Sequence, residues 1–188
     1  MSNRKEILVQ LLKDPDSGVS SSAAAALGLI EEQQSLDEVL AQLKKGGLAE
    51  KVRAIYALGE IGGEKVLAPL IYCASRPEPE LKGAAIDALG TVLNRAAVPV
   101  LLEKLKDDNS GIRARAIKAL GGFKDSSLAQ HFIPFLEAGD GLTDVEAALA
   151  LGNIGDPAME DILCALAHSP VAVSRAAAAT ALGLLKPA

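Results

Sequence analysis

The side chains with the clearest chemical potential lie near the end of the chain. Asp161, Cys164 and His168 follow one another at intervals of three and four residues, so they share one face of a predicted helix. A carboxylate, a thiol and an imidazole at this spacing could bind a metal ion or form a thiolate–imidazole pair. Cys164, however, stands at a repeat position that is otherwise apolar, and a buried cysteine usually behaves as a small apolar residue. We therefore predict that Cys164 belongs to the core, and we expect no catalytic, metal or cofactor site.

A second set of candidates is a series of basic side chains at a constant interval. One cation stands seven residues before each of four repeated leucines: Lys51, Lys82, Arg113 and Arg175. Such a strip could bind phosphate or an acidic partner. Ser20 and Asp144 occupy the same position elsewhere and interrupt it. We therefore expect each cation to pair with an acid of a neighbouring turn, such as Asp107, Asp108 or Asp140, and to add little stability.

An internal repeat positions both sets of residues. The tripeptide Ala-Leu-Gly occurs six times at a spacing of 31 residues, with its leucines at Leu27, Leu58, Leu89, Leu120, Leu151 and Leu182. A fixed period of roughly 20 to 50 residues is typical of a solenoid, in which each repeat packs only on its neighbours. Glycine inside a helix costs about 1 kcal/mol, so we expect a packing reason for it, namely the close approach of another backbone.

Two apolar patterns within each repeat predict two helices. An alanine four residues before the leucine and an apolar residue three after it form one face of a first helix. Apolar residues 12, 13 and 16 positions after the leucine form the core face of a second helix. Turn and capping residues separate the two, among them Gly62-Gly63 and Asp156-Pro157. Because no strand pattern is present, we predict an all-α chain of about six helix-turn-helix repeats and about 12 helices.

The phase of the pattern defines the repeat boundaries. We predict a single array over residues 1–188, which opens with a lone second helix at 3–13 and closes with a lone first helix at 169–186. Between them lie five two-helix repeats, at 14–45, 46–75, 76–107, 108–138 and 139–168. Solenoid ends are normally covered by polar helices. The last helix is poor in polar residues, so we predict that Ala179, Leu182 and Leu185 contact a partner or a second copy of the chain.

Two segments of this repeat resemble HEAT-like repeats of the phycocyanobilin-lyase type. One is Asp-Asn-Ser-Gly-Ile-Arg at 108–113, followed by Ala-Ile-Lys-Ala-Leu-Gly at 116–121, and the other is Leu-Gly-Asn-Ile-Gly-Asp-Pro-Ala at 151–158. The resemblance implies a right-handed α-solenoid whose second helices line the concave side. The chain departs from the family pattern eight residues before the leucine, where Glu50, Thr143 and Ser174 replace an apolar residue. Such repeats serve enzymes, scaffolds and binding modules alike, so the resemblance alone assigns no function.

The outward face of the second helices is the strongest candidate for a binding surface. At about 100° per residue, positions 7, 10, 11, 14 and 15 after the leucine point away from the predicted core. They carry the apolar, aromatic and proline side chains that are typical of a protein-recognition groove. The residues that we expect to contact a partner are Pro69, Tyr72, Val100, Glu103, Lys104, His131, Phe135, Ile162 and Leu166. Pro134 could interrupt its helix and turn Phe135 into the core.

Composition limits the classes of function. A formal net charge of −5 and the absence of Trp disfavour nucleic acid as a partner, and no segment reads as membrane-spanning or as a signal peptide. Two cysteines without a paired spacing suit a reduced, cytoplasmic protein. We predict a non-enzymatic adaptor that binds a peptide or helix of another protein in its concave groove. The alternative is a bilin-lyase-like accessory subunit that holds a chromophore or a client protein, with contacts from Tyr72, Lys104, His131 and Phe135.

Overall fold

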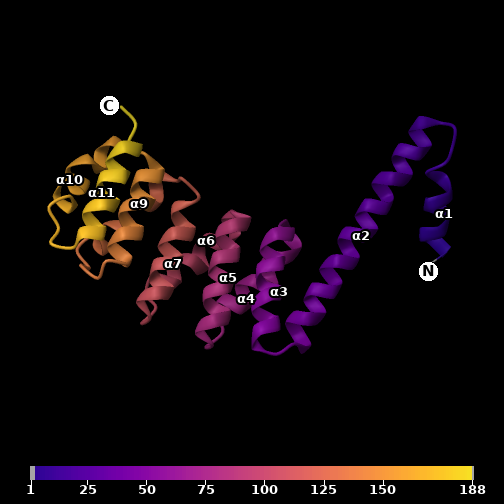
Figure 1. Ribbon diagram of the computed structural model, residues 1–188, viewed down its shortest axis with the longest axis horizontal. Helices are drawn as coiled ribbons and strands as arrows, with labels where there is room; N and C mark the ends of the chain where they lie inside the picture. The colour runs from indigo at the N-terminus through magenta and orange to yellow at the C-terminus, as the bar shows by residue number, and fades with distance from the viewer. Residues whose placement is uncertain (1–2, 188) are drawn as a thin grey trace.

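The computed structural model describes residues 3–187 as a stack of helices without a strand (Figure 1). The stack confirms the predicted all-α solenoid, with 11 α-helices in the described residues. None of these helices is both long enough and apolar enough to cross a membrane. The helices are α1 (Asn3–Leu11), α2 (Ser17–Lys45), α3 (Leu48–Ile61), α4 (Leu67–Ala74), α5 (Pro79–Val92), α6 (Val98–Lys104), α7 (Ser110–Gly121), α8 (Ala129–Phe132), α9 (Thr143–Ile154), α10 (Glu160–Leu166) and α11 (Ala172–Leu184). Short 3₁₀ turns border the second helices: η1 (Glu64–Val66), η2 (Arg95–Ala97), η3 (Ser126–Leu128), η4 (Ile133–Phe135) and η5 (Pro157–Met159).

The first helices of the repeats stack side by side. Each of α3, α5, α7 and α9 contacts the next first helix, ending at α11, and the second helices pack behind this row (Figure 1). The anchor leucines from Leu58 to Leu151 are fully buried. A Cβ atom built on the glycine of one first helix would lie only 2.7 to 3.0 Å from the alanine Cβ of the next, at the pairs Gly59–Ala88, Gly90–Ala119, Gly121–Ala150 and Gly152–Ala181. Glycine is therefore required at these four contacts, which we call the closed junctions.

A left-handed residue and a turn end the first helices α3, α5, α7 and α9. The residue four positions after the anchor leucine has a positive φ: Gly62 (67°), Leu93 (52°), Lys124 (52°) and Gly155 (70°). In the last three of these repeats the residue after it is Asn94, Asp125 or Asp156. The side-chain oxygen of this residue accepts a hydrogen bond from the backbone N–H two residues further on. Because this geometry reverses the chain direction, each second helix folds back beside the array.

The first repeat lacks this turn, and its two predicted helices form one. α2 runs without a break over 29 residues, so the expected division of 14–45 into two helices is wrong. Glu31 and Glu32 occupy the positions of the left-handed residue and the residue after it, and residues 31–35 read Glu-Glu-Gln-Gln-Ser, mostly strong helix formers. The N-terminal half of α2 therefore continues away from the array, with α1 packed alongside (Figure 1).

Buried hydrogen bonds replace the expected apolar residue at the start of α9 and α11. Ser174 and Asp144 are both fully buried, and Ser174 Oγ donates a 2.6 Å hydrogen bond to Asp144 Oδ2 across the junction between these helices. Thr143 is also fully buried, and its Oγ1 donates to Asp140 Oδ2 at 2.8 Å. Because buried polar groups are tolerated when they are hydrogen-bonded, the departures from the family pattern leave the stack intact.

Candidate functional site

A pocket of about 400 Å³ opens where α4 meets the C-terminal half of α2 and the start of α3. Tyr72, which is 63% exposed, is the aromatic residue of its lining. We call it the Tyr72 pocket. Its lining consists of Leu40, Leu43, Lys44, Lys51, Pro69, Tyr72, Cys73, Arg76 and Leu81. The pocket thus combines leucine side chains, an aromatic ring and three cationic groups.

Arg76 organises the polar part of the Tyr72 pocket. Its guanidinium carbon lies 5.7 Å from the centre of the Tyr72 ring, and Nη1 donates to Tyr72 Oη at 3.2 Å. Nη2 forms a 3.1 Å ion pair with Glu78 Oε1. A backbone amide and the Arg76 guanidinium hold the pKa of Glu78 below its ordinary value. With Lys44 and Lys51 on the same walls, the pocket carries an excess of positive charge and suits an anionic ligand with a flat apolar body.

The thiol of Cys73 lines the same pocket. Cys73 is almost fully buried, and burial raises the pKa of its thiol although the charges of Arg76 and Lys51 oppose that shift. Because the thiolate is the nucleophilic form, the Cys73 thiol is a poor nucleophile at neutral pH. Its contribution to the pocket is therefore an apolar surface.

The second helices largely bury two of the three predicted core positions, 12 and 16, but differ from the prediction at positions 13 and 15. Position 12 after the leucine is fully buried, as expected, at Leu70, Leu101, Phe132 and Leu163. Position 15, expected to point outward, is instead buried or half-buried at Cys73, Lys104, Phe135 and Leu166. Position 13 is half-buried or exposed, and Cys164 at that position is exposed, so its prediction as a core residue is wrong. The reason is that second helices such as α4 pack mainly on the first helix of the following repeat, and the repeat pattern does not reveal that preference.

The predicted concave-face residues therefore divide into two groups. Tyr72, Glu103 and His131 are exposed, although only Tyr72 and the half-buried Pro69 line a described pocket. The others face the core to different degrees: Lys104 and Leu166 are buried, and Val100, Phe135 and Ile162 are half-buried against it. Because Lys104 and Phe135 are turned inward, their predicted role as chromophore contacts is not supported. Lys44 and Arg76 were missed, since they lie outside the positions assigned to the concave face.

The basic series is used mainly within the fold. Lys82 Nζ lies 2.6 Å from Asp107 Oδ2. Burial opposes ionisation of Asp107, but the Lys82 ammonium and a backbone amide outweigh it and lower the pKa of Asp107. Arg113 and Arg175 instead donate to backbone carbonyl groups of the loops that precede their helices. Lys51 is the member of the series that faces the Tyr72 pocket.

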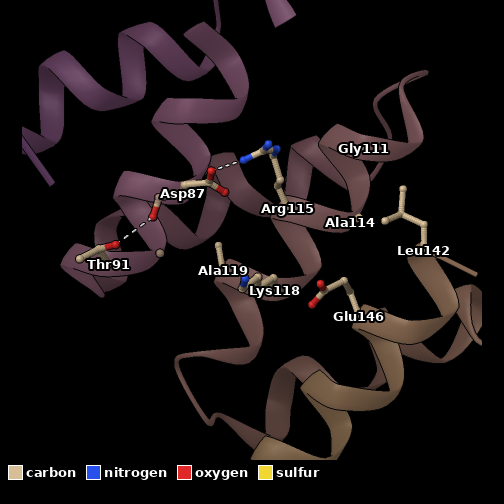
Figure 2. Close-up of a pocket in the computed structure, with 10 residues that line it drawn as sticks. Asp87, Thr91, Gly111, Ala114, Arg115, Lys118, Ala119, Leu142 and Glu146 are labelled. Atoms are coloured by element: carbon tan, nitrogen blue, oxygen red, sulfur yellow. Dashed lines mark hydrogen bonds and ion pairs between the residues drawn. The ribbon is translucent and has the colours of Figure 1, made fainter. Parts of the chain in front are cut away.

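A second pocket, which the repeat pattern does not predict, lies between α5, α7 and the start of α9. Its volume is about 570 Å³, and Figure 2 shows Arg115 of α7 reaching the carboxylate of Asp87 on α5. Lys118 and Glu146 line the same pocket. Burial raises the pKa of the Glu146 carboxyl, and the Lys118 charge opposes that shift. Two acids and two bases balance one another here, so this pocket lacks the cationic excess of the Tyr72 pocket.

The predicted contact surface on α11 is partly covered by the array itself. Ala179 is exposed, whereas Leu182 and Leu185 are half-buried and pack against the core. A Cβ atom built on Gly183 would meet nothing within 4 Å among the described residues. The uncovered part of α11 therefore lies around Ala179 and Gly183.

Solved structures share this fold. The complex of CpcE and CpcF of phycocyanin lyase from Nostoc sp. PCC7120 is similar with a TM-score of 0.70 and 24% identity, over 80% of this chain and 65% of that chain. A designed armadillo repeat protein in complex with the peptide (KR)4 is similar with a TM-score of 0.60 and 17% identity, over 98% of this chain and all (100%) of that one.

A relative by sequence is phycocyanobilin lyase subunit alpha of Synechococcus elongatus. It is 29% identical over 119 residues, which cover 58% of this chain and 44% of the relative. The chain thus spans less than half the length of that subunit. This relative is named as a lyase subunit, and that finding contradicts the prediction of a non-enzymatic adaptor.

The family model for HEAT repeats matches residues 37–111, 67–141 and 98–183, in overlapping matches that together run from 37 to 183. The matched region coincides with the part of the chain in which first helices stack through the closed junctions. The chain therefore belongs to the family of HEAT-repeat proteins, and it is similar in sequence to a phycocyanobilin lyase subunit.

Proposed function

We propose that the chain acts as a subunit of a bilin-lyase-like assembly, in which the Tyr72 pocket holds an open-chain tetrapyrrole while the chromophore is joined to a client protein. The similarity to a phycocyanobilin lyase subunit supports this class of role. The observation that carries the proposal is the presence of three cations around an aromatic ring in one pocket. We expect this assembly to act in the cytoplasm and to bind protein rather than nucleic acid.

The chemistry of an open-chain tetrapyrrole matches the Tyr72 pocket. Such a chromophore is a conjugated, largely apolar molecule with two propionate carboxylates. Lys44, Lys51 and Arg76 offer charges to the carboxylates, and the Tyr72 ring and the leucine side chains offer apolar surface. Because the pKa of Cys73 is raised, we expect the thiol that accepts the chromophore to belong to the client protein.

Titration of the protein with phycocyanobilin, followed by absorbance, tests this proposal. Wild-type protein should change the spectrum of the chromophore, and the double variant Lys51→Ala/Arg76→Ala should weaken binding by about tenfold or more, because charge-assisted hydrogen bonds to the carboxylates are lost. The control is His131→Ala, which removes an exposed side chain outside the pocket and should leave binding unchanged. An unaltered wild-type spectrum, or equal binding by all three proteins, would contradict the proposal.

The exposed residues of the second helices support a second proposal, that the outer face of these helices binds a segment of the client protein. Tyr72 and His131 stand exposed on α4 and α8, and exposed aromatic side chains are frequent anchors at protein interfaces. The designed armadillo neighbour carries a bound peptide, which shows that an array of this shape can hold one. The double variant Tyr72→Ala/His131→Ala should weaken client binding without changing the helical circular-dichroism signal. Unchanged binding would contradict this assignment.

The uncovered part of α11 is the surface where we propose a contact with a partner subunit or a second copy. Ala179 is exposed, and Gly183 leaves space for an approaching backbone among the described residues. Light scattering over a concentration series, alone and with the client protein, tests the contact. Ala179→Arg should weaken any association found, because a large charged side chain would enter a surface of small residues. Association that is unaffected by this variant would place the contact elsewhere.

A further inference from the structure

The Ala-Leu-Gly contact is open at one internal place in the array. At the closed junctions the alanine is 0 to 6% exposed: Ala88, Ala119, Ala150 and Ala181. The equivalent alanine of α3, Ala57, is only half-buried. On the other side, a Cβ atom built on Gly28 would meet nothing within 4 Å among the described residues, although Gly59 at the next repeat meets Ala88. Gly28 and Ala57 are therefore two halves of a contact that this chain does not make, and we call them the open junction.

The segment that carries Gly28 has an unusual apolar surface. Five large apolar side chains of α1, the turn after it and the N-terminal half of α2 are between 36% and 66% exposed: Ile7, Val9, Leu12, Val19 and Leu29. Residues 17–30 include no charged side chain. A helix that faces water on most of its surface normally carries charged residues there. The composition of this segment therefore suits burial against another surface.

The continuous helix keeps this segment away from its own α3. Leu36 is buried against the array, and Gly28 lies eight residues earlier, about 12 Å further along the helix axis at about 1.5 Å per residue. A cavity of about 890 Å³ separates residues 29–36 of α2 from the end of α3 and the turn that follows. Lys65 Nζ donates to Gln33 Oε1 at 2.6 Å across it. As long as α2 remains unbroken, Gly28 therefore cannot reach Ala57 of the same chain.

We propose that a second copy of the chain completes the open junction in a domain-swapped dimer. The segment 3–30 of each copy lies on α3 of the other, and Gly28 of one meets Ala57 of its partner. The register of the repeat supports this occupant, because Ala23, Leu27 and Gly28 correspond to Ala54, Leu58 and Gly59. Those latter residues build the first closed junction with α5. The segment 3–30 thus carries the glycine side of the contact, and α3 carries the alanine side at Ala57.

The hinge of this exchange is the segment 31–35. In a domain swap the loop that would fold an element back onto its own chain is extended, and each chain places that element on the other. Because the exchange is reciprocal, it gives a two-fold dimer rather than a filament. Here the loop position is filled by helix formers, where the other repeats have a left-handed residue and a turn. The sequence of 31–35 therefore favours the open, exchanged form.

Restoring the turn tests the proposal. The variant Glu31→Gly/Glu32→Asp copies Gly155-Asp156, so its α2 should break and residues 3–30 should fold back onto their own α3. Both proteins also carry Ala179→Arg, which weakens any association through α11. By light scattering, the protein with the native hinge should have twice the chain mass of 19.4 kDa, and the turn variant should have the mass of one chain. The control, Gln33→Ala/Gln34→Ala, keeps helix formers at the hinge and should remain a dimer. A monomer with the native hinge at high concentration, or a turn variant that stays dimeric, would overturn the proposal.

Cross-linking identifies which copy fills the junction. Ser20→Cys and Glu50→Cys are combined in a chain whose native cysteines are replaced, as Cys73→Ala and Cys164→Ser, and the oxidised protein is run on a non-reducing gel. These two positions are the equivalents of Asp144 and Ser174, whose side chains meet across the junction between α9 and α11. The swapped dimer should give a covalent dimer, because each new pair spans two chains. A disulfide within one chain would overturn the proposal. So would the absence of any disulfide when the control pair Asp144→Cys/Ser174→Cys, at a junction that is closed within one chain, forms one.

Discussion

The open junction and the four closed junctions carry the same Ala-Leu-Gly residues but have different structures. Gly59, Gly90, Gly121 and Gly152 each lie against an alanine of the next first helix, whereas Gly28 does not. The difference lies four residues after the anchor leucine, where the closed repeats have a left-handed residue and the first repeat has Glu31 within a helix. The motif thus prepares two helix faces for contact, and the turn residues decide whether one chain brings those faces together.

Adding a methyl group at a closed junction should have the largest effect. At Gly152 the new Cβ atom would lie 2.6 Å from Ala181 Cα, so Gly152→Ala should lower the free energy of unfolding by about 3 kcal/mol, as overpacked cores do. Gly183→Ala is the matched control, because nothing described lies within 4 Å, and it should raise stability by up to about 1 kcal/mol through helix propensity. Urea unfolding monitored by circular dichroism measures both. Equal losses would show that close approach is not the reason for the glycine.

Removing the buried hydroxyl between α9 and α11 should have the next largest effect. Ser174→Ala deprives the fully buried Asp144 carboxyl of its 2.6 Å hydrogen bond, which should cost about 2 kcal/mol. Thr180→Ala removes an exposed hydroxyl from the same helix and should change stability by less than about 0.5 kcal/mol. The difference between the two urea midpoints is the measured quantity. Its absence would mean that this junction is closed by apolar contacts alone.

The same methyl addition at the open junction should affect association rather than folding. Gly28→Ala should leave the monomer at least as stable as the wild-type monomer, because no described atom lies within 4 Å of the new Cβ. In the proposed swapped dimer the new methyl group would instead meet Ala57 of the partner copy. We expect the dimer dissociation constant to rise about tenfold, equal to about 1.4 kcal/mol, as measured by sedimentation. Ala25→Ser is the control, at a position whose equivalents Tyr56 and Lys118 are exposed. A dissociation constant that does not change would separate Gly28 from the dimer contact.

The smallest effect concerns pH. The pKa of Asp107 is lowered in the folded state, so its ion pair with Lys82 adds stability above the ordinary value of 3.8, and this contribution is lost as the pH falls through the folded pKa. Lys82→Met should therefore cost up to about 1 kcal/mol at pH 7 and much less at a pH at which Asp107 is protonated in the folded state. Lys51→Met, at the equivalent position of the preceding repeat, should show a smaller dependence on pH. Parallel loss at both pH values would assign the effect to packing of the lysine stem.

The fold was largely predictable because the residues that pack one repeat on the next recur at fixed positions in the sequence. The anchor leucines are buried where the pattern placed them, and the glycines serve close backbone contact. The binding surface was less predictable. Position 15 of the second helices was assigned to the outside, yet Lys104 and Leu166 are buried there, because a second helix packs mainly on the following repeat. Arg76, which organises the Tyr72 pocket, follows α4 and has no repeat position that marks it.

The sequence by itself determined the repeat, its 31-residue period, the helical class and the requirement for glycine where helices meet. These properties follow from short-range periodicity, which each repeat expresses in its own residues. Tertiary structure decided three further features. These are which positions of the second helices are buried, how Lys44, Lys51 and Arg76 come to line one pocket with Tyr72, and whether Gly28 contacts Ala57. The reason is that these features depend on the angle at which one element meets another, and a few turn residues set that angle for the whole array.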